Sequence, residues 1–351
     1  MLMAVQTILV CEVQVPLVHG GAEILVRQLV ERLRGYGYRV DLVSVPFKWY
    51  PRDEILANAA AWRLLDLSES NGIPIDLVIA TKFPSYFVRH ANKVVWLVHQ
   101  HRAAYELCGT LYSDFGHTDL DVGLRQELLA LDTQMLGECR RRFTIADNTT
   151  ARLKTFNGLD AETLYHPPRL ADRIIGGSAQ DYILSVGRLE TIKRHDLAIR
   201  AMALHQGPVR LVIVGTGTQQ ANLAALVEQL GLNDRVHLAG AVDDDTLIGL
   251  YAGARGVFFA PFDEDYGYVT LEGFLAHKPV LTARDSGGTL EFVQDGVNGW
   301  VCDPTPESVA DAFAELTGTP ARSAALGDAG YERARLITWD GVIERLVGVA
   351  R

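Results

Sequence analysis

The sequence predicts an α/β fold made of two consecutive parallel-sheet domains. Short apolar runs of strand length alternate with amphipathic helical segments through most of the 351 residues, a pattern typical of doubly wound parallel sheets. The alternation breaks at Pro167-Pro168, where two prolines disfavour both helix and sheet, and it resumes at residue 182. The chain is also longer than most single domains. Two domains of similar size are therefore expected.

The expected elements divide between these two domains. The first should hold strands at 7–11, 39–45, 76–80, 93–98 and 142–146, and helices at 23–36 and 123–141. The second should hold strands at 182–186, 209–214, 235–239, 256–260 and 279–282, and helices at 194–206, 219–230, 244–253, 269–276, 290–295 and 306–316. We place the two Rossmann-like domains at 1–168 and 169–330, followed by a helical segment at 331–351.

Composition narrows the class of protein. A net charge of −10 disfavours nucleic acid as a partner. The four cysteines are far apart and include no Cys-x-x-Cys pair, which favours reduced thiols over a disulfide frame or a zinc site. The first ten residues lack the pattern of a signal peptide, so we expect a cytoplasmic protein. The basic run 140–142 is compatible with peripheral membrane contact, although such runs are more often solvated helix ends.

Residues 259–288 contain the densest group of functional signals. Glu264 lies in a polar loop after an apolar strand, and Glu272 is expected in the first turn of the helix that follows. Gly267 allows a sharp turn between them. Because a helix start favours anions, two carboxylates flanking one suggest a ligand with hydroxyls at both ends and phosphate in the middle.

Two further loops are expected at the carboxyl ends of strands, where open parallel sheets bind ligands. Gly20-Gly21 would let a phosphate or sugar approach the backbone, although an ordinary strand–helix turn is the more common explanation of such a pair. Arg188 and Lys193 flank a loop that opens a helix and would suit a diphosphate, although solvated charge is the simple alternative.

Two weaker patterns bear on specific cofactors. Gly215-Thr216-Gly217 begins like a dinucleotide fingerprint, but Gln220 stands where the third glycine is required, so we expect a loop near a nucleotide base and no NAD site. His99 and His101 share a strand face, with Asp114 or His117 as conceivable third metal ligands. We prefer the interpretation that a histidine of this pair lines a cleft, and a purely structural histidine is the alternative. No metal ion is expected.

Together these segments resemble the GT-B glycosyltransferases, in particular their large retaining family 4. The resemblance rests on Gly20-Gly21-Ala22-Glu23, on SVGRLETIKRHDLAIRAM from Ser185, and on DEDYGYVTLEGFLAHKPVLT from Asp263, which has the family's Glu-x7-Glu spacing. It is good over 180–300 and looser over the first domain. It implies two Rossmann-like domains facing across a cleft, with the 331–351 segment packing back on the first.

The resemblance also implies roles for individual residues. In that family the residue matching Glu272 holds the ribose of a nucleotide sugar, and the one matching Glu264 contacts the donor sugar. Arg188 and Lys193 would hold the diphosphate, in place of a metal ion, with help from backbone N–H groups at Tyr268, Val269 and Thr270. His99 would face the reacting carbon.

The expected function is transfer of a sugar, with retention of configuration, from a UDP- or GDP-sugar to a glycan, lipid-linked or small-molecule acceptor. The nucleotide sugar is the substrate, and no separate cofactor is expected. Two departures from the family pattern, His277 before Lys-Pro and Tyr266 in the Glu264 loop, leave the sugar open. The alternatives are a nucleotide-sugar epimerase or another enzyme of this fold, and a catalytically silent sugar-binding protein.

Overall fold

The computed structural model describes residues 5–17 and 20–348 and contains two compact units. Unit 1 comprises Met1–His166 with Thr338–Arg351, and unit 2 comprises Pro167–Ile337. Each unit has its own six-stranded sheet in which every strand pair is parallel. The predicted α/β class with two parallel-sheet domains is confirmed.

The sheet of unit 1 has the order β2-β1-β5-β6-β7-β8. Its strands are β1 (Thr7–Gln14), β2 (Arg39–Pro46), β5 (Leu77–Ala80), β6 (Lys93–Leu97), β7 (Arg141–Thr144) and β8 (Glu162–Thr163), and a short antiparallel pair is formed by β3 (Glu69–Ser70) and β4 (Ile73–Pro74). The helices are α1 (Gly21–Gly35), α2 (Asp53–Leu64), α3 (Asp119–Gly137), α4 (Asp147–Asn157) and α11 (Trp339–Val347), with 3-10 turns η1 (Ser85–Phe87) and η2 (Arg102–Ala104). Buried residues of α2, α3 and α4 form one core with the sheet.

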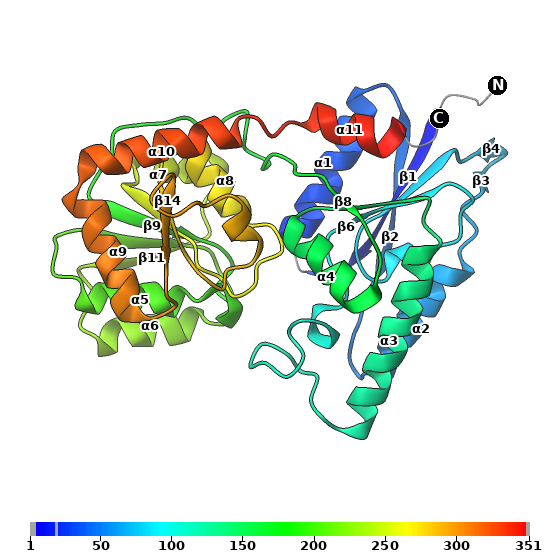
Figure 1. Cartoon of the computed structure of the whole chain (residues 1–351), viewed down its shortest axis with the longest axis horizontal. Helices are drawn as coiled ribbons and strands as arrows, with labels where there is room; N and C mark the ends of the chain where they lie inside the picture. The colour runs from blue at the N-terminus through cyan, green and yellow to red at the C-terminus, as the bar shows by residue number, and fades with distance from the viewer. Residues whose placement is uncertain (1–4, 18–19, 349–351) are drawn as a thin grey trace. The chain divides into compact units, whose positions relative to one another are not determined.

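The sheet of unit 2 has the order β11-β10-β9-β12-β13-β14, so the strand order reverses between β9 and β12. The strands are β9 (Tyr182–Val186), β10 (Arg210–Val214), β11 (Val236–Gly240), β12 (Gly256–Phe258), β13 (Val280–Ala283) and β14 (Gly299–Cys302). The helices are α5 (His195–Leu204), α6 (Gln220–Gln229), α7 (Asp244–Gly253), α8 (Tyr268–Leu275), α9 (Pro306–Gly318) and α10 (Pro320–Ala334), with 3-10 turns η3 (Thr191–Lys193) and η4 (Gly288–Glu291). Helices α5, α6 and α9 cover one face of this sheet, and α7, α8 and α10 cover the other (Figure 1).

Several elements differ from the sequence expectations. Helices α2 and α4, most of α10 and strand β14 were not predicted, and the expected helix at 290–295 is the shorter turn η4. Helix α3 begins at Asp119, four residues before the expected start, because Thr118 caps it by accepting a hydrogen bond from the backbone N–H of Asp121. Helix α8 begins at Tyr268 and not at Val269.

The unit boundaries also differ from the expected 1–168, 169–330 and 331–351. The chain passes from unit 1 to unit 2 at His166–Pro167 and returns to unit 1 at Ile337–Thr338. Helix α10 extends to Ala334 and remains with unit 2, where Gly330 allows it to lie against the ring of Phe274 in α8. Helix α11 belongs to unit 1 and lies beside α1 (Figure 1).

Helix α11 is attached to unit 1 by an aromatic contact. Trp339 is 5% exposed, and its ring centroid lies 6.1 Å from that of Trp96 in β6 and 6.0 Å from that of His166. Arg345 pairs with Glu162 of β8, and Tyr36 at the end of α1 donates a hydrogen bond to Asp340. Burial of Trp339 and of the aliphatic Val342, Ile343, Leu346 and Val347 therefore supplies most of the binding energy for this helix, because exposed polar pairs contribute little.

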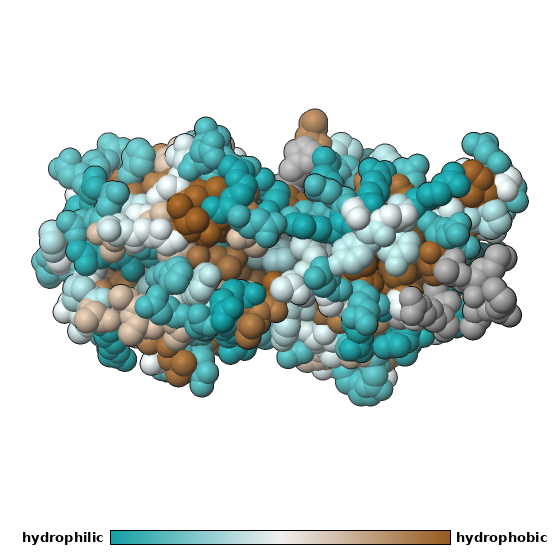
Figure 2. All heavy atoms as spheres, turned by 90° about the horizontal axis from the view of Figure 1, so that it is seen from above, coloured by the Kyte–Doolittle hydropathy of each residue, from teal (hydrophilic) through white to brown (hydrophobic). Residues whose placement is uncertain are grey.

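The hydropathy of the surface and of the described helices bears on contact with a membrane. Hydrophilic residues predominate on the face shown in Figure 2, with hydrophobic residues scattered among them. None of the helices in the described part of the chain has the length and hydropathy of a bilayer-spanning segment. The side chains of the basic run 140–142 form hydrogen bonds within the protein, to Asn92, to Glu162 and to the backbone carbonyl of Asp160.

We predict that Trp339→Ala destabilises unit 1. Removal of a buried tryptophan costs about 3–5 kcal/mol, and the change should appear as a lower midpoint in urea unfolding followed by far-UV circular dichroism. Leu336→Ala is the control, because Leu336 is 72% exposed and its removal should change stability by less than about 0.5 kcal/mol. Equal midpoints for the two variants would contradict the assigned role of Trp339.

We also predict that stability falls as the pH is lowered from about 6.5 toward 3. Burial lowers the pKa of His166 to about 3, whereas an unfolded histidine titrates near 6.5. In that window the unfolded state binds the proton and the native state does not, so acid favours unfolding by up to about 1.4 kcal/mol per pH unit. His166→Gln should flatten the profile of unfolding free energy against pH, and His237→Gln, at an exposed histidine, should leave it unchanged.

Candidate functional site

The candidate site of unit 2 lies at the carboxyl edge of its sheet, where the strand order reverses between β9 and β12. Ligands bind at such a point in open parallel sheets because the neighbouring loops diverge there. Three loops meet at this edge: 187–194 after β9, 259–267 after β12 and 284–288 after β13. The predicted residues Arg188, Lys193 and Glu264 all lie on these loops.

Lys193 and Glu264 form an ion pair between the first two loops. They are 71 positions apart in sequence, and their side chains are only 15% and 18% exposed. The Lys193 ammonium also lies 5.6 Å from the centroid of the Phe259 ring. Arg188 is exposed on the same loop and takes no part in this pair. The structure therefore brings one of the two predicted cations directly to the predicted carboxylate.

The Glu264 loop is joined to the 284–288 loop by backbone contacts. The N–H of Glu264 donates to the carbonyl of Ser286 at 3.3 Å, and the N–H of Gly288 donates to the carbonyl of Glu264 at 2.7 Å. Gly287 has a φ of 57°, and a Cβ there would lie 2.6 Å from the Glu264 carbonyl oxygen. A side chain at 287 would force the loops apart, so this glycine is required for Glu264 to keep its position.

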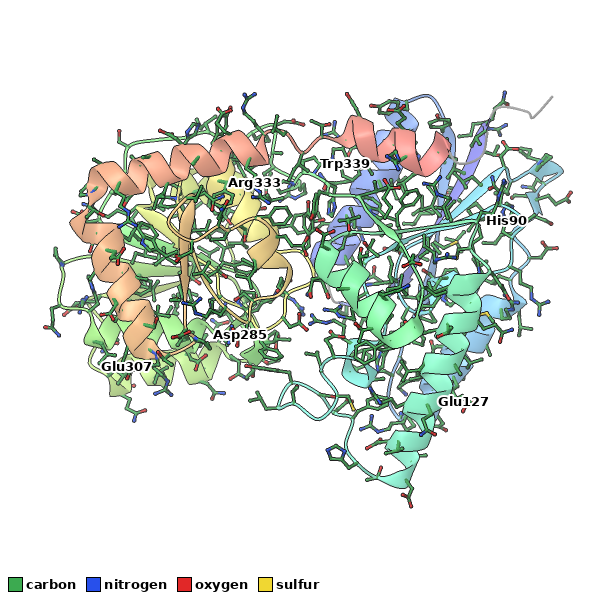
Figure 3. The ribbon with its side chains drawn as sticks, in the orientation of Figure 1. His90, Glu127, Asp285, Glu307, Arg333 and Trp339 are labelled. Atoms are coloured by element: carbon green, nitrogen blue, oxygen red, sulfur yellow. The ribbon has the colours of Figure 1, made fainter. Side chains whose placement is uncertain are left out.

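Arg194 links all three loops and was not identified from the sequence. Its guanidinium donates to both carboxylate oxygens of Asp285, at 2.7 and 2.8 Å, and to the carbonyl oxygens of Ala260 and Pro261, at 2.7 and 2.9 Å. Its backbone has a φ of 52°, a left-handed conformation that is uncommon for residues other than glycine. Asp285, labelled in Figure 3, lies on the loop after β13. No short-range pattern in the sequence indicates this contact across 91 positions.

Glu272 is one residue further into α8 than predicted. The helix begins at Tyr268, so Glu272 lies in its second turn and not in its first. Its carboxylate is half-buried and accepts a 2.6 Å hydrogen bond from the hydroxyl of Tyr251 in α7. Burial raises the pKa of Glu272, while this hydrogen bond opposes the shift. Tyr251 therefore orients the carboxylate and favours its ionised form.

The start of α8 is set by Gly267, whose φ of 84° turns the chain into the helix. The predicted N–H groups of Tyr268, Val269 and Thr270 form the first turn, and that of Thr270 already donates to the carbonyl of Gly267 at 3.0 Å. Because the leading N–H groups of a helix point out along its axis, the Tyr268–Val269 end is where an anion would be favoured.

Gly215 and Gly217 have a structural explanation. A Cβ on Gly215 would lie 1.9 Å from the carbonyl oxygen of Gly187, and one on Gly217 would lie 2.5 Å from that of Leu189. The loops after β9 and β10 therefore pack backbone to backbone, with the N–H of Leu189 donating to the carbonyl of Thr216 at 2.9 Å. These glycines therefore allow the loop after β10 to lie directly against the loop that carries Arg188.

In unit 1, Gly20-Gly21 leads into α1 at the carboxyl edge of the sheet. Gly20 is the N-cap residue of α1, and its N–H donates to a carboxylate oxygen of Glu23 at 2.9 Å. Glu23 also pairs with Lys82, which follows β5, and both side chains are 8% exposed. Burial is the largest single influence and favours the neutral carboxyl, but the Lys82 charge together with the hydrogen bonds from Lys82 and from backbone N–H groups outweighs it, so the pKa of Glu23 is lowered. The glycine loop is therefore held by a buried ion pair that the sequence analysis did not identify.

His99 follows β6 in unit 1, and its Nδ1 lies 2.7 Å from the carbonyl oxygen of Gln100. That contact places the proton of a neutral imidazole on Nδ1. His101 instead packs among the rings of Phe47, Phe83 and Phe115, and burial lowers its pKa to about 4. In the described ranges, 5–17 and 20–348, no three His, Cys, Asp or Glu side chains are grouped to hold a metal ion.

Comparison with known proteins finds a family match within unit 2. Residues 174–333 match the family model described as glycosyl transferases group 1. The chain is 34% identical over 182 residues to a D-inositol 3-phosphate glycosyltransferase of Acidothermus cellulolyticus, an alignment that covers 48% of this chain and 40% of that protein. This chain therefore spans less than half the length of that relative. It is also 25% identical over 373 residues to an uncharacterized glycosyltransferase of Methanocaldococcus jannaschii, with 95% of each chain covered.

Among solved structures, this fold resembles that of Anabaena HepE in complex with UDP and glucose. The TM-score is 0.70 at 16% sequence identity, with 98% of this chain and 99% of that chain covered. At this level of identity the likeness shows a shared fold. Residues 174–333 are thus similar to the glycosyl transferases group 1 family, and the two parallel-sheet units have the GT-B fold.

Proposed function

We propose that this protein transfers a sugar from a UDP- or GDP-sugar to a hydroxyl of a glycan, lipid-linked or small-molecule acceptor, with retention of configuration and without a metal ion. The observation that carries the proposal is the Lys193–Glu264 pair at the strand-order reversal of a unit that matches the family model. A cation beside a carboxylate at this point suits a ligand that carries both phosphate and hydroxyl groups.

The donor would lie along the carboxyl edge of unit 2. Arg188, Lys193 and the first turn of α8 would hold the diphosphate, and Glu272, oriented by Tyr251, would accept hydrogen bonds from the ribose. Glu264 would accept hydrogen bonds from the donor sugar. The complex of Anabaena HepE with UDP and glucose, in a protein of the same fold, supports this class of donor.

In this arrangement, donor binding would exchange the ion-pair partner of Lys193. A diphosphate competes with the Glu264 carboxylate for the Lys193 ammonium. When the diphosphate takes Lys193, Glu264 is left to accept hydrogen bonds from sugar hydroxyls. Fixed cations then stabilise the negative charge that develops on the departing nucleoside diphosphate, and this is the main electrostatic requirement of glycosyl transfer.

Unit 1 would supply the acceptor side of the reaction. The Gly20-Gly21 loop, held by Glu23 and Lys82, offers backbone that a phosphate or sugar can approach. His99 would face the reacting carbon in the same proposal. Retention would follow from a front-side displacement, in which the leaving phosphate accepts the proton of the acceptor hydroxyl. A nucleotide-sugar epimerase is the second candidate, and release of nucleoside diphosphate only when an acceptor is present distinguishes the two.

Replacement of the donor-binding residues should abolish most transfer. Arg188→Ala should lower kcat by about 10²–10³-fold, as loss of one preorganised charge contact does. Glu264→Ala should lower kcat/KM for the donor, and Glu272→Ala should raise the donor KM. The assay is acceptor-dependent release of UDP or GDP, and Glu332→Ala, at an exposed carboxylate of α10, is the control. Full activity in all three site variants would contradict the assignment.

The Arg194–Asp285 contact should be needed for the geometry of the loops. Asp285→Asn breaks a charge-assisted bidentate pair, which costs about 1.5–3 kcal/mol, and should lower both Tm and kcat/KM for the donor. Arg194→Lys should do the same, because lysine cannot reproduce the bidentate geometry. Asp303→Asn is the matched control, since its partner Arg284 and Asp303 itself are 65% and 63% exposed. If the Asp303 variant loses as much activity as the Asp285 variant, the positioning role is wrong.

A further inference from the structure

A cavity of about 250 Å³ lies in unit 2 at the amino edge of the sheet. Arg255 precedes β12, and Lys278 and Pro279 precede β13. These residues therefore lie at the opposite edge of the sheet from the loops that carry Glu264 and Asp285. The remainder of the lining comes from the segment before β9, from the end of α9 and from α10. The four residues of β13 separate this cavity from the carboxyl edge by about 13 Å.

Lys278 is the unusual feature of this cavity. It is 5% exposed, and its ammonium donates one hydrogen bond, at 2.7 Å, to the carbonyl oxygen of Gly177. An ammonium has three donors. Within the described part of the chain Lys278 forms no ion pair, and burial alone lowers its pKa. A buried charge is ordinarily paired, because desolvation without a counter-charge is costly.

The other charged residues of the lining are already paired. Arg255 contacts Asp181 at 2.5 Å, and His277 Nδ1 contacts Asp328 at 2.7 Å. The His277 ring is also stacked on Tyr331, with centroids 4.0 Å apart. Among the described residues, Lys278 is therefore the one cationic side chain of the lining, apart from the pH-dependent His277, that has no carboxylate partner.

We propose that this cavity is a second binding site, for a small organic monoanion whose carboxylate or phosphate pairs with Lys278. An anion there would supply the missing counter-charge and accept the remaining N–H donors of the ammonium. The lining also offers apolar surface at Pro279, Leu316 and Ala324, which suits a short hydrocarbon portion. The ligand class is therefore a small acid with a compact apolar body.

The site adjoins the donor-binding helix without sharing its residues. Lys278 follows α8 after Ala276 and His277, and His277 takes a left-handed φ of 59°. The N–H of Lys278 donates to the carbonyl of Gly273, so the backbone at the cavity closes the last turn of the helix. The proposal does not depend on sugar transfer, and its test requires no activity assay.

The test is a thermal-shift titration of the full chain with sodium butyrate and, separately, sodium phosphate, at constant ionic strength. Both the wild type and the Lys154→Met control, at an exposed lysine, should show a rise in Tm that saturates with anion concentration. Lys278→Met should abolish the butyrate rise. Because phosphate can also bind at the donor loops, Lys193→Met is titrated in parallel, and the phosphate response that survives it should depend on Lys278.

The identity of the anion is read from the two titrations. A saturable rise with butyrate indicates a carboxylate ligand, and a Lys278-dependent rise with phosphate alone indicates a phosphate ligand. The proposal is overturned if neither anion gives a saturable rise, or if the rise in Lys278→Met equals that of the wild type. If Lys278→Met does not fold, NMR of ¹³C-labelled lysine decides the question, because the Lys278 signal, assigned with Lys278→Arg, must shift on titration.

Discussion

The candidate site of unit 2 depends on one side chain, the guanidinium of Arg194. Three loops leave the carboxyl edge of the sheet, and each would move independently without a connection between them. Arg194 joins them with four hydrogen bonds, to Asp285 and to two carbonyl groups of the loop that carries Glu264. These contacts require a left-handed backbone at Arg194, which is energetically unfavourable for a residue with a side chain. A glycine could adopt this conformation more easily, but it could make none of the contacts.

Close backbone packing also holds these loops together, in addition to the contacts of Arg194. At Gly187–Gly215 and at Glu264–Gly287, two loops approach so closely that a single Cβ would separate them. Such contacts tolerate little adjustment, so the carboxylate of Glu264 and the ammonium of Lys193 are presented from a stiff support. Binding energy from a ligand is then not spent on ordering the loops.

The sequence predicts the parts of this architecture that are written in short-range patterns. Strand–helix alternation predicted both sheets, and the spacing of Glu264 and Glu272 placed both near the start of α8. Helix α2 was missed because its apolar Ile55, Ala59 and Trp62 are separated by further alanines that blur the amphipathic pattern. The contacts of Arg194 and Lys193 span 91 and 71 positions, and only the folded sheet brings such partners together.

The return of α11 to unit 1 has a consequence for the order in which the protein is made. Unit 2 is a continuous segment, whereas unit 1 is assembled from the first part of the chain and a helix that follows Ile337. During synthesis, the residues of unit 2 emerge complete before Trp339 exists to cover Trp96 and His166. The part of unit 1 that precedes unit 2 is thus completed only after unit 2, and a ribosome-bound chain presents an apolar surface on unit 1 until translation reaches α11.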